Sequence, residues 1–91
     1  LDWKAAGSFP EDIPTLLQAL LLLSAGDWDN AHRIAQSDGS TDGSWVHAYL
    51  HRVEGDLGNA FYWYRSAGKD ITQISSPEEW EYIAMALLEK S

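Results

Sequence analysis

Apolar side chains recur three and four residues apart in five stretches of the chain. This spacing puts them on one face of a helix and predicts helices over about 13–25, 28–36, 45–54, 57–67 and 76–90. The clearest stripe is the last one, which runs through Trp80, Ile83, Ala84, Leu87 and Leu88. No stretch alternates apolar and polar residues as a half-buried strand does. The pattern therefore predicts an all-α protein.

Residues with capping preferences mark where two of these helices begin. Ser44 precedes the third helix, at the end of a turn-rich segment, 37–44 (SDGSTDGS), which we expect to form a surface loop. The last helix is predicted to start after Ser76 as its N-cap, with Pro77 in the first position. Glu79 would then complete a capping box.

A chain of 91 residues is long enough for one domain with its own core. Residues 1–12 lack a helical period and contain Gly7 and Pro10, so we expect an irregular arm that ends where Asp12 caps the first helix. The predicted single helical domain, 1–91, consists of this arm, 1–12, a first helical hairpin, 13–36, a second hairpin, 45–67, and a last helix, 76–90.

Charge and composition exclude several classes of partner. Fourteen acidic residues against six Lys and Arg give a net charge of −8, which repels a phosphate backbone, so we expect no nucleic acid partner. The longest apolar run, 19–23, is far shorter than the roughly 20 residues of a membrane span, so we expect no membrane insertion. The chain has no cysteine and hence no disulfide or thiolate chemistry. We expect a soluble, cytoplasmic protein.

Two segments of the chain repeat each other 29 residues apart. Residues 26–35 (GDWDNAHRIA) align with residues 55–64 (GDLGNAFYWY) at a Gly, an Asp, an Asn and an Ala. A helix precedes each segment, so each unit reads as a helix, a Gly-Asp turn and a second helix. Ala31 and Ala60 are the matched small residues that let the paired helices approach closely.

The second unit resembles a tetratricopeptide repeat. Ala48 takes the small position of the first helix and Gly55-Asp56 takes the turn. Ala60, Tyr64 and Ala67 take the small, aromatic and small positions of the second helix. The resemblance implies a tetratricopeptide-like stack of two helical hairpins plus a C-terminal capping helix. It also implies a role in protein interaction or as a scaffold.

A second resemblance covers residues 28–67. The segment from Trp28 to His32 (WDNAH) and the block from Trp45 to Arg65 (W-x-H-A-x-x-H-R-x-E-x-D-x-x-N-A-x-Y-W-x-R) are similar to a family of small uncharacterised microbial proteins. No activity is assigned to that family, so this resemblance implies no function.

Candidate chemistry gathers on the third predicted helix. His47, His51 and Glu54 follow one another at i, i+4 and i+7, apart from the apolar face of the same helix. The tetratricopeptide register directs this stripe toward the partner helix of the hairpin, where a buried polar group without a hydrogen bond costs about 1–3 kcal/mol. The residues available to bond it are Arg52, Asp56, Asn59, Tyr62, Arg65 and His32.

Three interpretations of this stripe stay open. In the first, it is a structural hydrogen-bond network that fixes how the helices pack. In the second, it belongs to a surface that holds a small molecule or a peptide, formed by His47, His51, Arg52, Glu54, Asn59, Tyr62, Trp63 and Arg65. In the third, it is a divalent-metal site in which His47 and His51 are joined by Glu54 or His32.

The sequence alone assigns no function. No cysteine or Gly-x-Ser-x-Gly elbow marks a nucleophile, so we do not expect an enzyme. A small interaction or scaffold module with a protein or peptide partner is the expectation. The alternative is a protein that uses the stripe of His47, His51 and Glu54 to bind a small molecule or a divalent metal, or to act as a weak enzyme. The leucine-rich segment 16–23 is a candidate homodimer contact. We expect no cofactor, apart from that metal.

Overall fold

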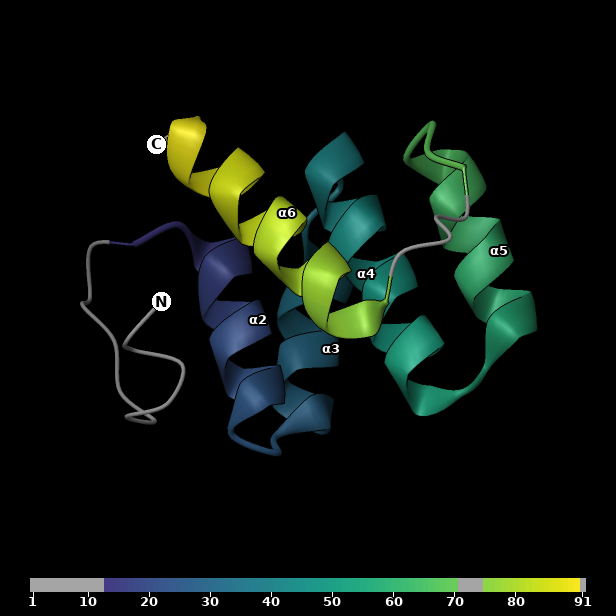
Figure 1. Ribbon diagram of the computed structural model, residues 1–91, viewed down its shortest axis with the longest axis horizontal. Coiled ribbons are helices and arrows are strands. Elements are labelled where there is room, and N and C mark those ends of the chain that lie inside the picture. Colours follow the sequence, from purple (N-terminus) through teal and green to yellow (C-terminus); the bar gives the residue numbers. More distant parts are fainter. Residues whose placement is uncertain (1–12, 71–74, 91) are drawn as a thin grey trace.

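The structure, a computed structural model, describes residues 13–70 and 75–90, and all regular secondary structure among them is helical (Figure 1). The helices are α2 (Thr15–Ser24), α3 (Trp28–Ser37), α4 (Thr41–Glu54), α5 (Leu57–Ser66) and α6 (Ser76–Glu89). The all-α prediction is confirmed. The predicted irregular arm, 1–12, and the expected cap Asp12 lie outside the described residues.

The helices pack as two hairpins and a crossing helix. α2 packs against α3, α4 packs against α5, and α3 joins the two hairpins by packing against α4. α6 lies across α2 and α4 (Figure 1). Among the described helices, α5 has α4 as its one backbone neighbour. The tetratricopeptide-like character of this stack stays a prediction.

The repeated Gly-Asp-x-x-Asn segment forms the same turn in both hairpins. Gly26 and Gly55 adopt φ of 90° and 91°, a left-handed conformation that favours glycine after a helix. Asp56 caps α5, where its carboxylate accepts from the backbone N–H of Asn59 at 3.3 Å and from the Asn59 side-chain amide at 2.7 Å. Asp27 caps α3 in the same way through Asn30. The repeat therefore encodes turn geometry.

The leucine-rich helix α2 supplies the centre of the hydrophobic core. Leu17 and Leu20 are fully buried, as are Val46 of α4 and Ile83 of α6. The indole Nε1 of Trp80 donates to the carbonyl of Leu20 at 3.1 Å and ties α6 to α2. Core packing within one chain thus explains the apolar character of α2, and a homodimer through residues 16–23 stays a prediction. None of the described helices has the length and apolar character to cross a membrane.

The prediction that Ser44 caps α4 is wrong, because the helix begins one turn earlier. Ser40 is the N-cap, and its hydroxyl accepts from the backbone N–H of Gly43 at 3.0 Å. A Cβ at Gly43 would lie 2.3 Å from the carbonyl oxygen of Asp38, so only glycine fits this close approach. The expected loop 37–44 is correspondingly shorter.

The predicted capping box of α6 is wrong by one residue. Ser75 is the N-cap, its hydroxyl accepts from the backbone N–H of Glu78 at 3.3 Å, and the Glu78 carboxylate accepts from the backbone N–H of Ser75 at 3.3 Å. Glu79, which was expected in this role, is instead turned inward and is 2% exposed. The shift matters because it places a carboxylate in the interior.

Candidate functional site

All three histidines of the chain meet between α3 and α4. His32 comes from α3, and His47 and His51 come from successive turns of α4. The Nε2 atoms of His32 and His47 lie 2.9 Å apart, and the ring centroids of His47 and His51 lie 5.0 Å apart. The centroids of His32 and His51 are separated by 5.3 Å, which closes the triangle. We call these three residues the histidine cluster.

Local sequence explains how these rings come together. The i, i+4 spacing stacks His47 and His51 on one face of α4. The Asp27 cap fixes where α3 begins, and α3 then packs against α4 with His32 on the facing side. His47 and His51 are buried, but the hairpin register, which directed the stripe toward α5, is only partly right. His47 stacks on Trp63 of α5, whereas His51 faces α3, and the Glu54 side chain is 43% exposed.

Two tryptophans hold the cluster from either end. Trp28 stacks on His32 with centroids 4.7 Å apart, and its indole Nε1 donates to the carbonyl of Leu50 at 3.0 Å. Trp63 of α5 stacks on His47 with centroids 4.0 Å apart and an interplanar angle of 15°. The indole rings restrict rotation of the imidazoles, so His32 and His47 are held in defined orientations.

Burial lowers the pKa of two of the three histidines. His47 is 4% exposed and His51 is 8% exposed, whereas His32 is half-buried. Desolvation lowers the pKa of His47 to about 4, and the neighbouring His32 and His51 act in the same direction. Desolvation, assisted by His51, also lowers the pKa of His32. Both rings are neutral at pH 7, which is the state in which imidazole binds metal ions.

Glu54 orients the third ring. The Nδ1 atom of His51 lies 3.1 Å from Oε1 of Glu54, which can only accept in this contact. In the neutral ring that contact fixes the proton on Nδ1 and leaves the lone pair on Nε2. A carboxylate behind the distal nitrogen of a histidine is the usual outer partner of a metal ligand. The Glu54 side chain is 43% exposed, and this arrangement gives it an orienting role.

The cluster has the donor set and size of a small metal site. One nitrogen from each of the three histidines lies within 4.8 Å of the other two. Zinc–nitrogen bonds of 2.0–2.1 Å place tetrahedral ligand atoms about 3.3 Å apart, so side-chain shifts of roughly 1 Å would complete the geometry. A second group, His51, Glu54 and Asp56, has the same spacing, but its two carboxylates are exposed and already bonded to His51 and to Asn59.

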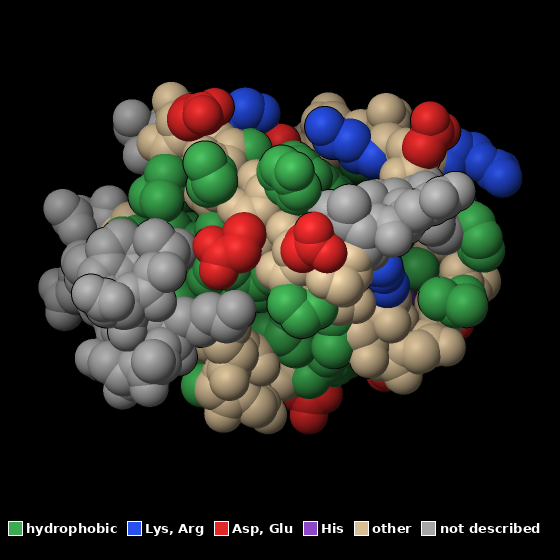
Figure 2. All heavy atoms as spheres, in the orientation of Figure 1, with side chains coloured by type: hydrophobic (Ala, Val, Ile, Leu, Met, Phe, Trp, Pro, Cys, Tyr) green, Lys and Arg blue, Asp and Glu red, His purple; other side chains and the backbone are tan. Residues whose placement is uncertain are grey.

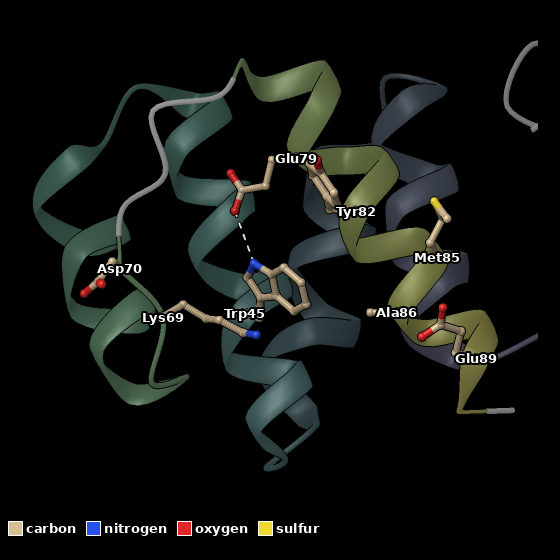
Figure 3. Close-up of a pocket in the computed structure, with 8 residues that line it drawn as sticks. All are labelled: Trp45, Lys69, Asp70, Glu79, Tyr82, Met85, Ala86 and Glu89. Atoms are coloured by element: carbon tan, nitrogen blue, oxygen red, sulfur yellow. Dashed lines mark hydrogen bonds between the residues drawn. The ribbon is translucent and has the colours of Figure 1, made fainter.

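Arg52 belongs to a different cluster, on another side of α4. Its Nη1 donates to Oε1 of Glu79 at 2.5 Å, and the Tyr64 hydroxyl donates to the same carboxylate from 2.6 Å. Trp45 Nε1 donates to Oε2 at 3.2 Å (Figure 3). We call these four residues the glutamate cluster. Burial and the bond to Glu79 raise the pKa of Tyr64 and keep its hydroxyl protonated.

Glu79 is absent from the predicted site residues, although its position in the sequence indicates that it is buried. With Ser75 as the N-cap, Glu79 stands one turn before Ile83 and two turns before Leu87, on the buried stripe of α6. An acid at a core position of an amphipathic helix indicates a nearby partner of opposite charge. In this structure the partner is Arg52 of α4.

The remaining predicted site residues lie apart from the histidines. Asn59 completes the cap of α5 with Asp56, and Arg65 is exposed. Tyr62 is exposed and meets Trp63 edge-on at 5.0 Å. Of the predicted ligand set, the structure thus brings together His47, His51, Glu54 and Trp63, with His32 added from the predicted metal set.

No known protein family, curated protein or solved structure matches this chain.

Proposed function

We propose that this protein binds a divalent transition-metal ion, zinc in the first instance, through His32, His47 and His51. One observation carries the proposal: the only three histidines of the chain converge, with a nitrogen of each inside one small volume. Imidazole nitrogens favour zinc, copper and nickel over magnesium or calcium, which prefer oxygen.

The electrostatics of the cluster support this function. The lowered pKa values of His32 and His47 mean that protons compete only weakly with a metal ion for their nitrogens. Burial also strengthens the interaction between ion and nitrogen by excluding water. Glu54 supplies a negative charge behind His51 that balances part of the ion's charge. Three nitrogen ligands leave a further coordination position for water or an external ligand.

A structural role for the same residues is the competing interpretation. In the part of the chain that the structure describes, no buried side-chain nitrogen or oxygen lacks a hydrogen-bond partner, so the apoprotein is already satisfied. The Nε2-to-Nε2 contact supports the metal proposal. In the apoprotein one Nε2 carries a proton and donates it to the other, and once that proton has shifted to Nδ1 of its own ring, both Nε2 lone pairs would be free to bind one ion.

Calorimetric titration of chelator-treated protein with Zn²⁺, Ni²⁺ and Co²⁺ tests the proposal. We expect one metal per chain, and we expect Co²⁺ to develop visible absorption typical of nitrogen ligands. His32→Gln, His47→Gln and His51→Gln should each abolish tight binding. Gln36→Ala is the matched control, because Gln36 is an exposed polar residue one turn beyond His32 on α3.

The result that overturns the proposal is equally defined. Chelator-treated wild type that is folded by circular dichroism and binds none of these ions would assign the cluster to packing alone. Binding that survives in all three histidine variants would place the ion elsewhere. His32→Gln is the most informative of the three variants, because His32 is the least buried and its loss disturbs the core least.

A further inference from the structure

α6 carries a second stripe of side chains, opposite its buried one. Tyr82 and Met85 are 60% and 58% exposed, which is high for side chains of this size. Acidic residues precede and follow them at helical spacing, so the outward stripe reads Glu78, Glu81, Tyr82, Met85 and Glu89. Figure 2 shows acidic side chains among hydrophobic ones over this helix. We call this stripe, with the hollow described next, the α6 face.

A hollow of about 520 Å³ opens beside the stripe (Figure 3). Trp45 of α4 lines it together with Lys69 and Asp70, which follow α5, and Tyr82, Met85 and Glu89 of α6. The bond from Trp45 Nε1 to Glu79 holds the indole in place. A second, smaller hollow shares Tyr82 and Met85, so these two side chains stand between two depressions.

The hollow already accommodates an alkylammonium group. Nζ of Lys69 lies 4.3 Å from the ring centroid of Trp45, within the range of a cation–π contact. A half-buried indole ring beside carboxylates attracts cations, and Lys69 of the same chain occupies this position. A lysine or arginine of another molecule would find the same chemistry there.

Charge around the hollow favours a basic ligand. Asp70 and Glu89 line it and are exposed, and Lys69 is the one base among the lining residues that the structure describes. The charge of Glu79 is balanced by Arg52, but the exposed acids keep theirs, and the whole chain carries −8. A second copy of this chain would bring acids against acids, and nucleic acid would bring phosphate against them.

We propose that the α6 face binds a basic amphipathic segment of another protein. Its apolar side chains would cover Tyr82 and Met85, and one Lys or Arg would enter the hollow over Trp45 and displace Lys69. The acidic residues along the stripe would pair with the remaining basic residues. This interaction is independent of the histidine cluster, which lies between α3 and α4, and it gives the expected interaction module a specific surface.

A fluorescence-polarisation screen of basic amphipathic helical peptides tests the proposal. Each peptide carries Leu along one face of its helix and Lys along the opposite face. We expect members of the library to bind wild-type protein and to shift the amide resonances of α6 and of residues around Trp45. Peptides with Lys replaced by Glu, or Leu replaced by Ser, should not bind. A library in which no member binds, or binding that shifts other regions, contradicts the proposal.

Matched variants separate this surface from general attraction to an acidic protein. Glu89→Lys should weaken binding about tenfold. Asp29→Lys makes the same charge change at an exposed position of α3 and should have little effect. Tyr82→Ser with Met85→Ser should abolish binding, and Phe61→Ser, at an exposed apolar position of α5, should not. Equal effects within either pair would overturn the proposal.

Lys69→Ala tests entry into the hollow directly. Removing the internal cation should tighten peptide binding about threefold, because the peptide's Lys no longer has to displace it. Weaker binding by this variant would mean that Lys69 is part of the contact and would contradict insertion over Trp45. The measurement needs no metal and can be made on chelator-treated protein, so its failure would leave the metal proposal untouched.

Discussion

α4 carries two polar clusters that differ in how their hydrogen bonds are matched. In the glutamate cluster, the carboxylate of Glu79 accepts hydrogen bonds from Arg52, Tyr64 and Trp45, so each donor is bonded to a negatively charged group. In the histidine cluster, nitrogen faces nitrogen, and the one acid in contact, Glu54, stands at the edge. Both networks are satisfied in the apoprotein, but the carboxylate of Glu79 is already neutralised by Arg52, whereas neutral imidazole nitrogens can exchange their mutual hydrogen bond for a metal ion. The comparison separates a structural cluster from a candidate site.

The largest expected effect comes from breaking the glutamate cluster. Glu79→Gln would remove the buried negative charge that Arg52 and the Tyr64 hydroxyl bond, so we expect a loss of about 3 kcal/mol in the free energy of unfolding. Urea denaturation measures it. Glu78→Gln is the control, because glutamine serves equally in a capping box, and a change of under ~0.5 kcal/mol is expected. Equal losses in both variants would contradict a structural role specific to Glu79.

Zinc should stabilise the protein through the histidine cluster and not through the glutamate cluster. At a free concentration one hundred times the dissociation constant, a ligand of the native state adds about 2.7 kcal/mol to the free energy of unfolding. We expect this gain in wild type and in Glu79→Gln, but not in His47→Gln. Thermal melting with zinc and with chelator measures it, and a gain that persists without His47 would contradict the site.

Lowering the pH should destabilise the metal-free protein, because His47 is harder to protonate in the folded state than in the unfolded chain. The pKa of His47 is about 4 in the folded state and about 6.5 in the unfolded state, so between these values the unfolded chain binds more protons. Stability from this group is therefore complete above pH 6.5 and is lost as the pH falls toward 4. Between pH 7 and pH 5 we expect a loss on the order of 1–2 kcal/mol. Urea denaturation at both pH values should show a smaller loss in His47→Gln.

The smallest expected effect on stability belongs to Glu54. Because its side chain is 43% exposed, the bond to His51 is solvent-screened, and Glu54→Gln should change the free energy of unfolding by less than ~0.5 kcal/mol. Zinc affinity should nevertheless fall by about 10-fold or more, since the charge behind His51 is lost. Paired denaturation and calorimetry check both halves. A stability loss with unchanged zinc affinity would make Glu54 a structural residue.

The helices were predictable because each depends on neighbouring residues. Apolar stripes and the Gly-Asp turns placed all five, and the cap errors have a local cause. Ser75 with Glu78 and Ser76 with Glu79 both fit a capping box, so the sequence offers two registers for α6. Burial of Glu79 against Arg52 decides between them, and that contact spans 27 residues.

Predicting the candidate site from sequence succeeded where the spacing is local and failed where it is not. The stacking of His47 and His51 on one face of α4 follows from their i, i+4 spacing, but the hairpin register directed that face toward α5 and did not predict the contact with α3. His32 appeared only as an alternative third ligand, because its contact with His47 joins two helices across 15 residues and depends on how α3 packs on α4. Arg52 and His51 are neighbours in sequence, yet they belong to different clusters because they leave α4 in different directions.

The isolation of α5 has a dynamic consequence. α4 is the one backbone neighbour of α5 among the described helices, and side chains such as Tyr64, bonded to Glu79, tie α5 to α6. With these few attachments, the amides of α5 should exchange with solvent before those of α2, α4 and α6. Trp63 is its link to the histidine cluster, through the stack on His47. An ion that fixes His47 would therefore slow the local opening of α5. Metal binding should then slow amide exchange in a helix that supplies no metal ligand.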